Sequence, residues 1–226
     1  MRSRGMGNDS ERFSLKIPLA LKCSKCKEPA SPKIHLDQTS FDWTCPNCGF
    51  VHPSLFGLDV TIGFLLLERS RYELITEKDF SMSIVMSAMA FESELSRLFG
   101  KWKQIDALRA DQDFNREACE KELRDFGRID RKIDKVSQFL VNKGMDVFVS
   151  ECPELSEPIS TRFQSIRISS LAKDFQENLF WPRNQILHWG DAKNSYEDAA
   201  ICYSLANMGL LILRKMDEER RKQLES

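Results

Sequence analysis

Four cysteines near the start of the chain constrain its fold more than any other feature. Cys23 and Cys26 form one C-x2-C pair, and Cys45 and Cys48 form a second pair after the intervening residues 27–44. This spacing is typical of a structural zinc site, in which two tight turns each present two thiolates to one tetrahedral ion. A segment of about forty residues cannot bury enough apolar surface to fold without such support. We therefore predict one structural Zn²⁺ per chain, held by these four sulfurs.

The residues around the cysteine pairs predict a small β-structure. Residues 33–37 and 40–44 alternate apolar and polar side chains, as short strands do. His35 and His52 are close in the sequence, but four thiolates complete the coordination of zinc, so neither histidine is expected to bind it. The lysines of this segment suit contact with a phosphate backbone or with a protein partner.

Beyond about residue 55 the apolar residues repeat with a helical period. We expect three parts: a mobile tail over residues 1–15, a zinc ribbon over residues 16–54 and an all-α domain over residues 55–226. The predicted fold class is therefore mainly α, a helical bundle preceded by a small β zinc ribbon. Helices are expected over residues 58–71, 80–101, 113–142 with a break near Gly127, 168–180 and 196–222, and a loop over residues 144–160.

Composition and charge exclude several classes of protein. The longest apolar run, residues 62–67, is far too short to cross a bilayer, so no membrane association is expected. No secretion signal is recognisable, and seven cysteines without one indicate a reducing, cytoplasmic setting. The net charge of −1 argues against nucleic-acid binding by bulk charge. Residues 1–33, however, carry eight Lys and Arg against three acidic residues, and such a basic end either holds a phosphate backbone or is only a solvated tail.

Candidate reactive residues gather in one short stretch, residues 181–190. Pro182 suits the first position of a helix, and Gly190 suits the position just after its end. Arg183 would then lie in the first turn, beside backbone N–H groups that favour an anion such as phosphate. The flanking Trp181 and Trp189 are expected in the core more than as stacking platforms for bases.

Three further features complete the candidate site. Asn184 and His188 are four residues apart and so share one face of the helix. Glu92 falls within an apolar stripe of the helix predicted over residues 80–101, where a carboxylate needs a partner, and Arg183 is a candidate. A guanidinium, an amide and an imidazole form a plausible set for cleaving a phosphodiester. The alternative is a solvated helix face on which Arg and His have no function.

These residues together resemble the signature of the HEPN superfamily of all-α domains. That signature is an Arg, a polar residue, several variable residues and a His near the start of the penultimate helix, which Arg183, Asn184 and His188 match. A long final helix follows, and Glu92 occupies a place similar to that of an acidic residue common in the family. The resemblance covers residue 55 to the C-terminus, but only residues 183–222 carry specific features.

The resemblance implies a metal-independent endoribonuclease. In that chemistry, single-stranded RNA is cleaved to 2′,3′-cyclic phosphate and 5′-OH ends without a catalytic metal. His188 would be the general acid or base, Arg183 would bind the phosphate, Asn184 would orient the backbone or His188, and Glu92 would hold Arg183 in place. The family also implies a homodimer with facing motifs, a toxin or defence role, and a regulatory or antitoxin protein as partner.

Two other functions stay open at this point. The chain could be a non-catalytic module on a dimeric helical scaffold that binds nucleic acid, a nucleotide or a protein, with Arg183 and His188 only contacting the ligand. It could also be a structural scaffold in which His188 is hydrogen-bonded in a dimer interface.

Overall fold

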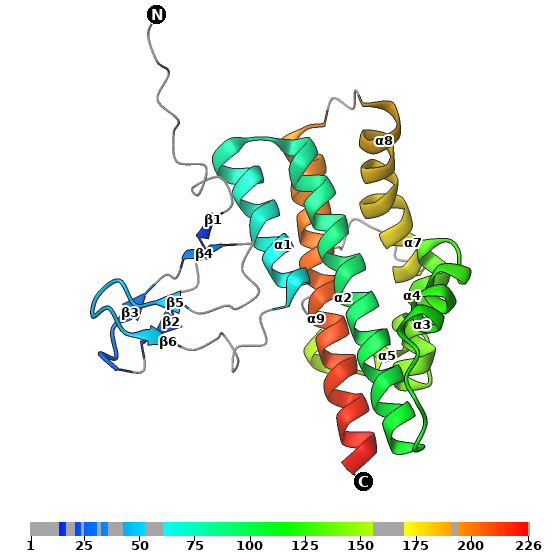
Figure 1. The fold of residues 1–226 in the computed structure, drawn as a ribbon. Helices are drawn as coiled ribbons and strands as arrows, with labels where there is room; N and C mark the ends of the chain where they lie inside the picture. The colour runs from blue at the N-terminus through cyan, green and yellow to red at the C-terminus, as the bar shows by residue number, and fades with distance from the viewer. Residues whose placement is uncertain are drawn as a thin grey trace, which may run out of the picture. The chain divides into compact units, whose positions relative to one another are not determined.

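The computed structural model of the protein divides into two compact units, Met1–Thr61 and Ile62–Ser226. The elements in each unit are coloured along the chain in Figure 1. The part that the structure describes is mainly helical, as the sequence predicts. The described residues are 14–16, 21–23, 25–30, 33–35, 43–52, 61–155, 170–190 and 194–225.

The N-terminal unit contains short antiparallel strand pairs. Strand β2 (Leu21–Lys22) pairs with β3 (Pro29–Ala30), and β5 (Trp43–Thr44) pairs with β6 (Val51–His52). Each C-x2-C pair therefore lies in the turn of a very small hairpin. A third pair joins β1 (Ser14–Lys16) to β4 (Lys33–His35). Strands β4 and β5 fall within the two predicted strand segments, whose other residues lie outside the described part.

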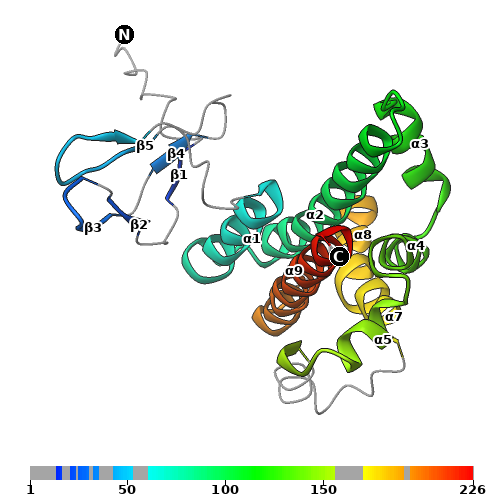
Figure 2. The ribbon, with the colours of Figure 1, turned by 90° about the horizontal axis from the view of Figure 1, so that it is seen from below.

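Two long helices form the centre of the helical unit. Helix α2 (Phe80–Arg109) and helix α9 (Tyr196–Glu225) pack against each other. Helix α1 (Ile62–Tyr72), which continues into the π-helical turn η2 (Glu73–Glu77), lies on one side of this pair. The remaining helices lie on the other side, as the two views show (Figures 1 and 2). Among the described residues no helix is long and apolar enough to cross a membrane.

The remaining helices are short and follow the expected breaks. Helix α3 (Arg116–Asp125) and helix α4 (Ile129–Val141) are separated at Gly127, whose φ of 76° confirms the predicted break. Helix α7 (Leu171–Phe175), the π-helical turn η3 (Gln176–Phe180) and helix α8 (Trp181–Trp189) follow one another directly.

Two of the predicted boundaries are wrong. Helix α2 passes through Gly100 and ends at Arg109, because the large side chain of Trp102 is buried and its packing outweighs the helix penalty of one glycine, about 1 kcal/mol. Residues 145–150 were expected in a loop but form helix α5 (Met145–Ser150). Met145, Phe148 and Val149 have the spacing of one helix face, and all three are buried.

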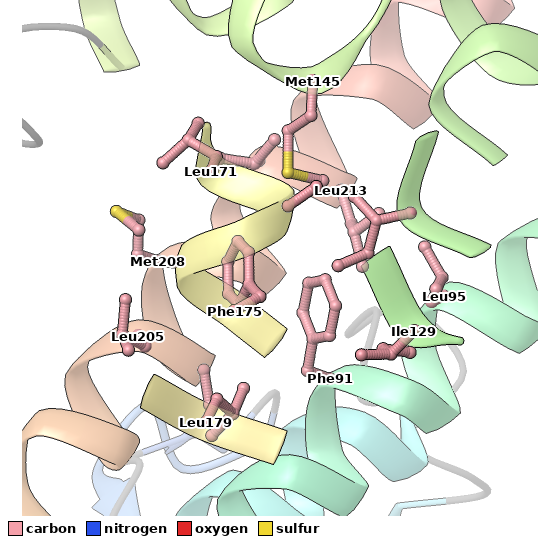
Figure 3. Close-up of a cluster of buried hydrophobic side chains, with 14 of the residues drawn as sticks. Phe91, Leu95, Ile129, Met145, Leu171, Phe175, Leu179, Leu205, Met208 and Leu213 are labelled. Atoms are coloured by element: carbon pink, nitrogen blue, oxygen red, sulfur yellow. The ribbon is translucent and has the colours of Figure 1, made fainter. Parts of the chain in front are cut away.

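The core fixes the distance between the helices. The ring of Phe91 on α2 stacks on that of Phe175 on α7, with centroids 4.5 Å apart (Figure 3). Helix α9 approaches this stack at Gly209, where an added Cβ would lie 2.4 Å from the Phe91 ring. A glycine is therefore required at this position, and the packing holds α2, α7 and α9 in one arrangement.

The apolar stripe predicted for α2 is only partly correct. Ala88 and Leu95 are buried, but Met89 is 38% exposed, and the buried face is instead centred on Phe91. Glu92 therefore lies at the edge of the core, not inside it, and its side chain is 34% exposed. On α9 the helical spacing of the apolar residues also predicts Ile201 and Leu211 in the core, but both are exposed.

Candidate active site and candidate metal centre

The helix that carries the predicted motif is supported from α9. Pro182 has no N–H, so it cannot donate to the carbonyl of Asn178, four residues earlier. Cys202 of α9 fills this position, because its Sγ lies 3.1 Å from the Asn178 oxygen. Burial raises the pKa of Cys202 to about 12, so the thiol keeps the proton that it donates. The π-helical turn η3 just before Pro182 accommodates the change in hydrogen bonding.

Helix α8 begins and ends where the sequence predicts, but it is not preceded by the expected non-helical residues. Pro182 is in the first turn, and Gly190 closes the helix with a φ of 69°. However, η3 runs directly into α8, and Phe180 at the junction is itself helical. The Trp181 N–H already donates to the Gln176 carbonyl. The expected open helix start that attracts an anion is therefore absent, and anion binding would have to come from side chains.

Arg183 and Glu92 form the ion pair that the sequence predicted. The Arg183 Nη2 lies 3.7 Å from the Glu92 Oε2, which joins α8 to α2. Lys132 of α4 approaches the other oxygen of the same carboxylate, with its Nζ 3.5 Å from Oε1. Arg183 and Lys132 are both mostly covered, with side chains 26% and 19% exposed. Glu92 thus stands between two cations supplied by two different helices.

Asn184 joins this cluster through Arg183. Its side-chain oxygen accepts a hydrogen bond of 3.1 Å from Arg183 Nη1. The Arg183 Nε is buried, and it has no hydrogen-bond partner among the residues that the structure describes. The guanidinium therefore has donor capacity that its neighbours in this part of the chain do not use.

His188 lies apart from these groups. It is exposed on α8, one helical turn beyond Asn184, and so shares a face with that amide. Within the described ranges no hydrogen bond or ion pair involves its ring. The structure thus brings together three of the four predicted residues, namely Glu92, Arg183 and Asn184, and leaves the imidazole exposed to solvent.

Sequence reasoning missed Lys132. The alternating charges of its segment favour a solvated helix face, yet the Lys132 side chain is only 19% exposed. Lys132 directly precedes Ile133, a fully buried residue of α4. Its place at the edge of an apolar stripe could have indicated a covered side chain, since a lysine stem often covers apolar surface while its ammonium reaches a partner.

A groove lies beside the start of α8. Its volume is about 760 Å³, and its lining includes Trp181, Lys173, Arg128 and two α4 carboxylates. Trp181 is 58% exposed, and Trp189 at the other end of α8 is 76% exposed. The expectation that these two tryptophans belong to the core is therefore wrong. An exposed indole beside a groove is a surface on which a planar base can stack.

The four cysteines form one compact cluster. Their Sγ atoms all lie within 4.8 Å of one another, and no disulfide links them. The Sγ atoms of Cys23 and Cys48 are 3.7 Å apart, and those of Cys26 and Cys45 are 3.8 Å apart. Four sulfurs at the Zn–S distance of about 2.3 Å in a tetrahedron lie about 3.8 Å apart. The cluster is therefore compatible with a structural zinc ion.

The two cysteine turns have the same backbone hydrogen bonds. The Cys23 N–H donates to the Glu28 carbonyl, and the Lys27 N–H donates to the Cys23 carbonyl. The Cys45 N–H and the Gly49 N–H make the two corresponding bonds in the second turn. Lys27 and Gly49 also share a left-handed backbone, with φ of 63° and 67°. A glycine after the second pair is typical of such a left-handed position, whereas lysine rarely adopts it, so the sequence does not indicate the turn at Lys27.

Comparison of the chain with protein-family models, with curated proteins and with solved structures gave no match. A function for this protein therefore has to be inferred from its own residues and their arrangement.

Proposed function

We propose that the helical unit is a metal-independent endoribonuclease of the HEPN type, acting on single-stranded RNA. The observation that carries this proposal is the cluster of Arg183, Asn184 and Glu92, held between α8 and α2. Arg183 is mostly covered and has unused donors, as a phosphate-binding guanidinium requires. The groove and exposed indole of Trp181, two residues before Arg183, offer a place for an adjoining base.

The proposed reaction needs no co-reactant. A neutral His188 takes the proton of a ribose 2′-OH, the 2′-oxygen bonds to the adjacent phosphorus, and the bond from phosphorus to the 5′-oxygen breaks. The 5′-oxygen leaves with a proton from an imidazolium or from water, giving a 2′,3′-cyclic phosphate and a 5′-OH. Arg183 stabilises the charge that develops on the phosphoryl oxygens, and Asn184 and Glu92 fix its direction.

The position of His188 favours a second candidate function. A general base is usually oriented by a further group, and His188 contacts none in the described part of the chain. The second candidate is a non-catalytic module that binds RNA, a nucleotide or a protein through Arg183 and the groove. Facing motifs in a homodimer would orient His188, so catalysis and dimerisation are proposed together. A sedimentation mass of a monomer at micromolar concentration would contradict the dimer.

The experiment that separates the two functions is cleavage of labelled single-stranded RNA in EDTA. We expect wild-type protein to leave cyclic-phosphate ends, and His188→Ala and Arg183→Ala each to lower the rate at least about 100-fold. The matched control is Arg109→Ala, which removes an exposed arginine of α2 outside the candidate site and should cleave normally. If wild type is inactive on several RNAs but binds them, and only Arg183→Ala weakens binding, the binding module is correct.

We further propose that Cys23, Cys26, Cys45 and Cys48 hold one structural Zn²⁺, and that this ribbon assists binding of RNA or a partner. Elemental analysis of protein purified without added metal should give one zinc per chain. Cys45→Ser should lose the zinc, whereas Cys152→Ser, outside the cluster, should keep it. Retention of a full equivalent by Cys45→Ser would contradict the assignment. The same measurement after EDTA treatment shows whether the ribbon is intact in the cleavage experiment.

A further inference from the structure

Glu92 is the only described carboxylate that is shared by Arg183 and Lys132. Lys132 comes from α4 and Arg183 from α8, so two separate helices direct cations at one point on α2. With both cations charged and Glu92 ionised, this three-residue cluster has a net charge of +1. A protein that needed only to neutralise Glu92 would require one of these cations.

Both ion pairs are loose. Charge-assisted N–H···O bonds are about 2.7–2.9 Å long, whereas Glu92 lies 3.5 Å from the Lys132 nitrogen and 3.7 Å from the nearest Arg183 nitrogen. Elsewhere in the same unit, the Lys101 ammonium reaches Asp217 at 2.7 Å, so the fold is able to close such contacts. The Arg183 Nε also has no hydrogen-bond partner within the described part of the chain. Together with these distances, this leaves donors on both cations for another anion.

We propose that Lys132 and Arg183 together bind one internal phosphodiester of an RNA strand, with Glu92 as the counter-ion that holds them in place when no RNA is bound. This inference rests on the proposed function and adds Lys132 as a second phosphate-binding residue. A phosphodiester carries one negative charge and so neutralises the cluster. It is also the group that the proposed cleavage requires, so we assign an internal phosphate, and not a chain end, to this site.

The experiment uses the full-length chain and a labelled single-stranded DNA, which lacks the 2′-OH and cannot undergo the proposed cleavage. Binding is measured by fluorescence anisotropy from 50 to 300 mM salt. Each phosphate contact contributes about 0.7 to the slope of log K against log[salt] for a single strand, which corresponds to about fivefold in affinity at 0.1 M. Lys132→Gln and Arg183→Gln should each lose about this much slope and affinity.

Three variants serve as controls. Lys121→Gln makes the same charge change at an exposed residue of α3 and should bind like wild type. Lys132→Arg keeps the charge and should retain most of the affinity, which excludes a purely structural effect of residue 132. Glu92→Gln removes the competing carboxylate and should bind more tightly than wild type, by about fivefold at 0.1 M salt.

The outcomes distinguish this inference from the proposed function. If Arg183→Gln weakens binding while Lys132→Gln behaves like Lys121→Gln, Lys132 is not a phosphate ligand, but the assignment of Arg183 stands. If neither variant differs from Lys121→Gln, both assignments fail. A 5′-phosphate on the DNA should leave affinity unchanged, and a gain of tenfold that disappears in Lys132→Gln would show a site for chain ends instead.

Discussion

Two carboxylates in the helical unit each meet two cations, yet their surroundings are opposite. Asp217 on α9 accepts contacts of 2.7–2.9 Å from Lys101, Trp102 and Arg221, and its side chain is 8% exposed. Glu92 on α2 meets its cations only at 3.5 and 3.7 Å and is 34% exposed. The Asp217 cluster is complete within the fold, whereas the Glu92 cluster still has donors to offer.

The difference teaches where to look for function within the helical unit. A buried ion cluster whose hydrogen bonds are short and saturated stabilises a particular packing and has nothing left for a ligand. A partly covered cluster with long contacts and an unpaired donor holds charges in place without neutralising them. The first kind should respond to mutation in stability, and the second kind should respond in binding and catalysis.

The largest expected effect is the loss of stability in Asp217→Ala. The substitution leaves the Trp102 N–H and the Lys101 ammonium without their partner at a buried site, so the free energy of unfolding should fall by about 3–5 kcal/mol. Urea unfolding followed by helical circular dichroism measures this change. The control Glu219→Ala removes a carboxylate of the same helix whose side chain is 42% exposed and whose ion pair with Lys222 is 3.8 Å long, so stability should change by less than about 0.5 kcal/mol. If both substitutions lowered the free energy of unfolding equally, the Asp217 cluster would not have the stabilising role that sets it apart from the Glu92 cluster.

Acid provides the next largest effect. Burial raises the pKa of Asp217. Hydrogen bonds from Lys101 and Trp102 and the nearby charges outweigh this effect and hold the pKa below its usual value. Since the folded pKa is lower than the unfolded value of about 3.9, the carboxylate stabilises the fold fully at about pH 5 and above, and this contribution is lost as the pH falls through the folded pKa.

The variant that isolates this contribution is Asp217→Asn. Wild type should be more stable than the variant at pH 7, and the gap should shrink below about pH 4, by up to about 1.4 kcal/mol per pH unit. The measurement is the urea midpoint from pH 7 to pH 2.5. A gap that stays constant over this range would mean that Asp217 stabilises the protein by packing, not by charge.

Much of the fold could be predicted from local chemistry. The break at Gly127 follows from its conformational freedom, and the start of α9 follows from the reciprocal cap in which Ser195 and Asp198 bond to each other's backbone N–H. Helix α5 could not be predicted in this way. Its apolar residues stand beside a proline-rich stretch, and only their burial in the core makes them helical.

The parts of the candidate site that lie on one helix could be predicted from the sequence, and so could the need of Glu92 for a cation. Arg183 and Asn184 are sequence neighbours, and the partner of Glu92 could be inferred because a carboxylate near an apolar stripe needs a cation. Lys132 could not, since nothing local shows that α4 approaches α2 at this point. The contact of Cys202 with the Asn178 carbonyl is equally non-local, although Pro182 showed that this carbonyl would need a donor from elsewhere.

A smaller effect is expected from Trp102→Phe. The change removes one donor to Asp217 but leaves the contacts from Lys101 and Arg221, so stability should fall by about 1 kcal/mol. The comparison is Trp181→Phe, which alters an exposed ring and should leave the unfolding midpoint unchanged. A loss as large as that of Asp217→Ala would show that the indole N–H, and not the ion pairs, holds the cluster together.

The smallest change in stability is expected from Glu92→Gln, and this is the sharpest test of the comparison. Its ion pairs are long and partly exposed, so the free energy of unfolding should change by less than about 1 kcal/mol. Cleavage should nevertheless fall about tenfold under saturating RNA, because Arg183 loses the anion that directs it. Uncleavable DNA should bind more tightly at the same time. A structural carboxylate would instead lower stability, binding and cleavage together, so opposite signs for binding and rate identify Glu92 as a residue that positions Arg183.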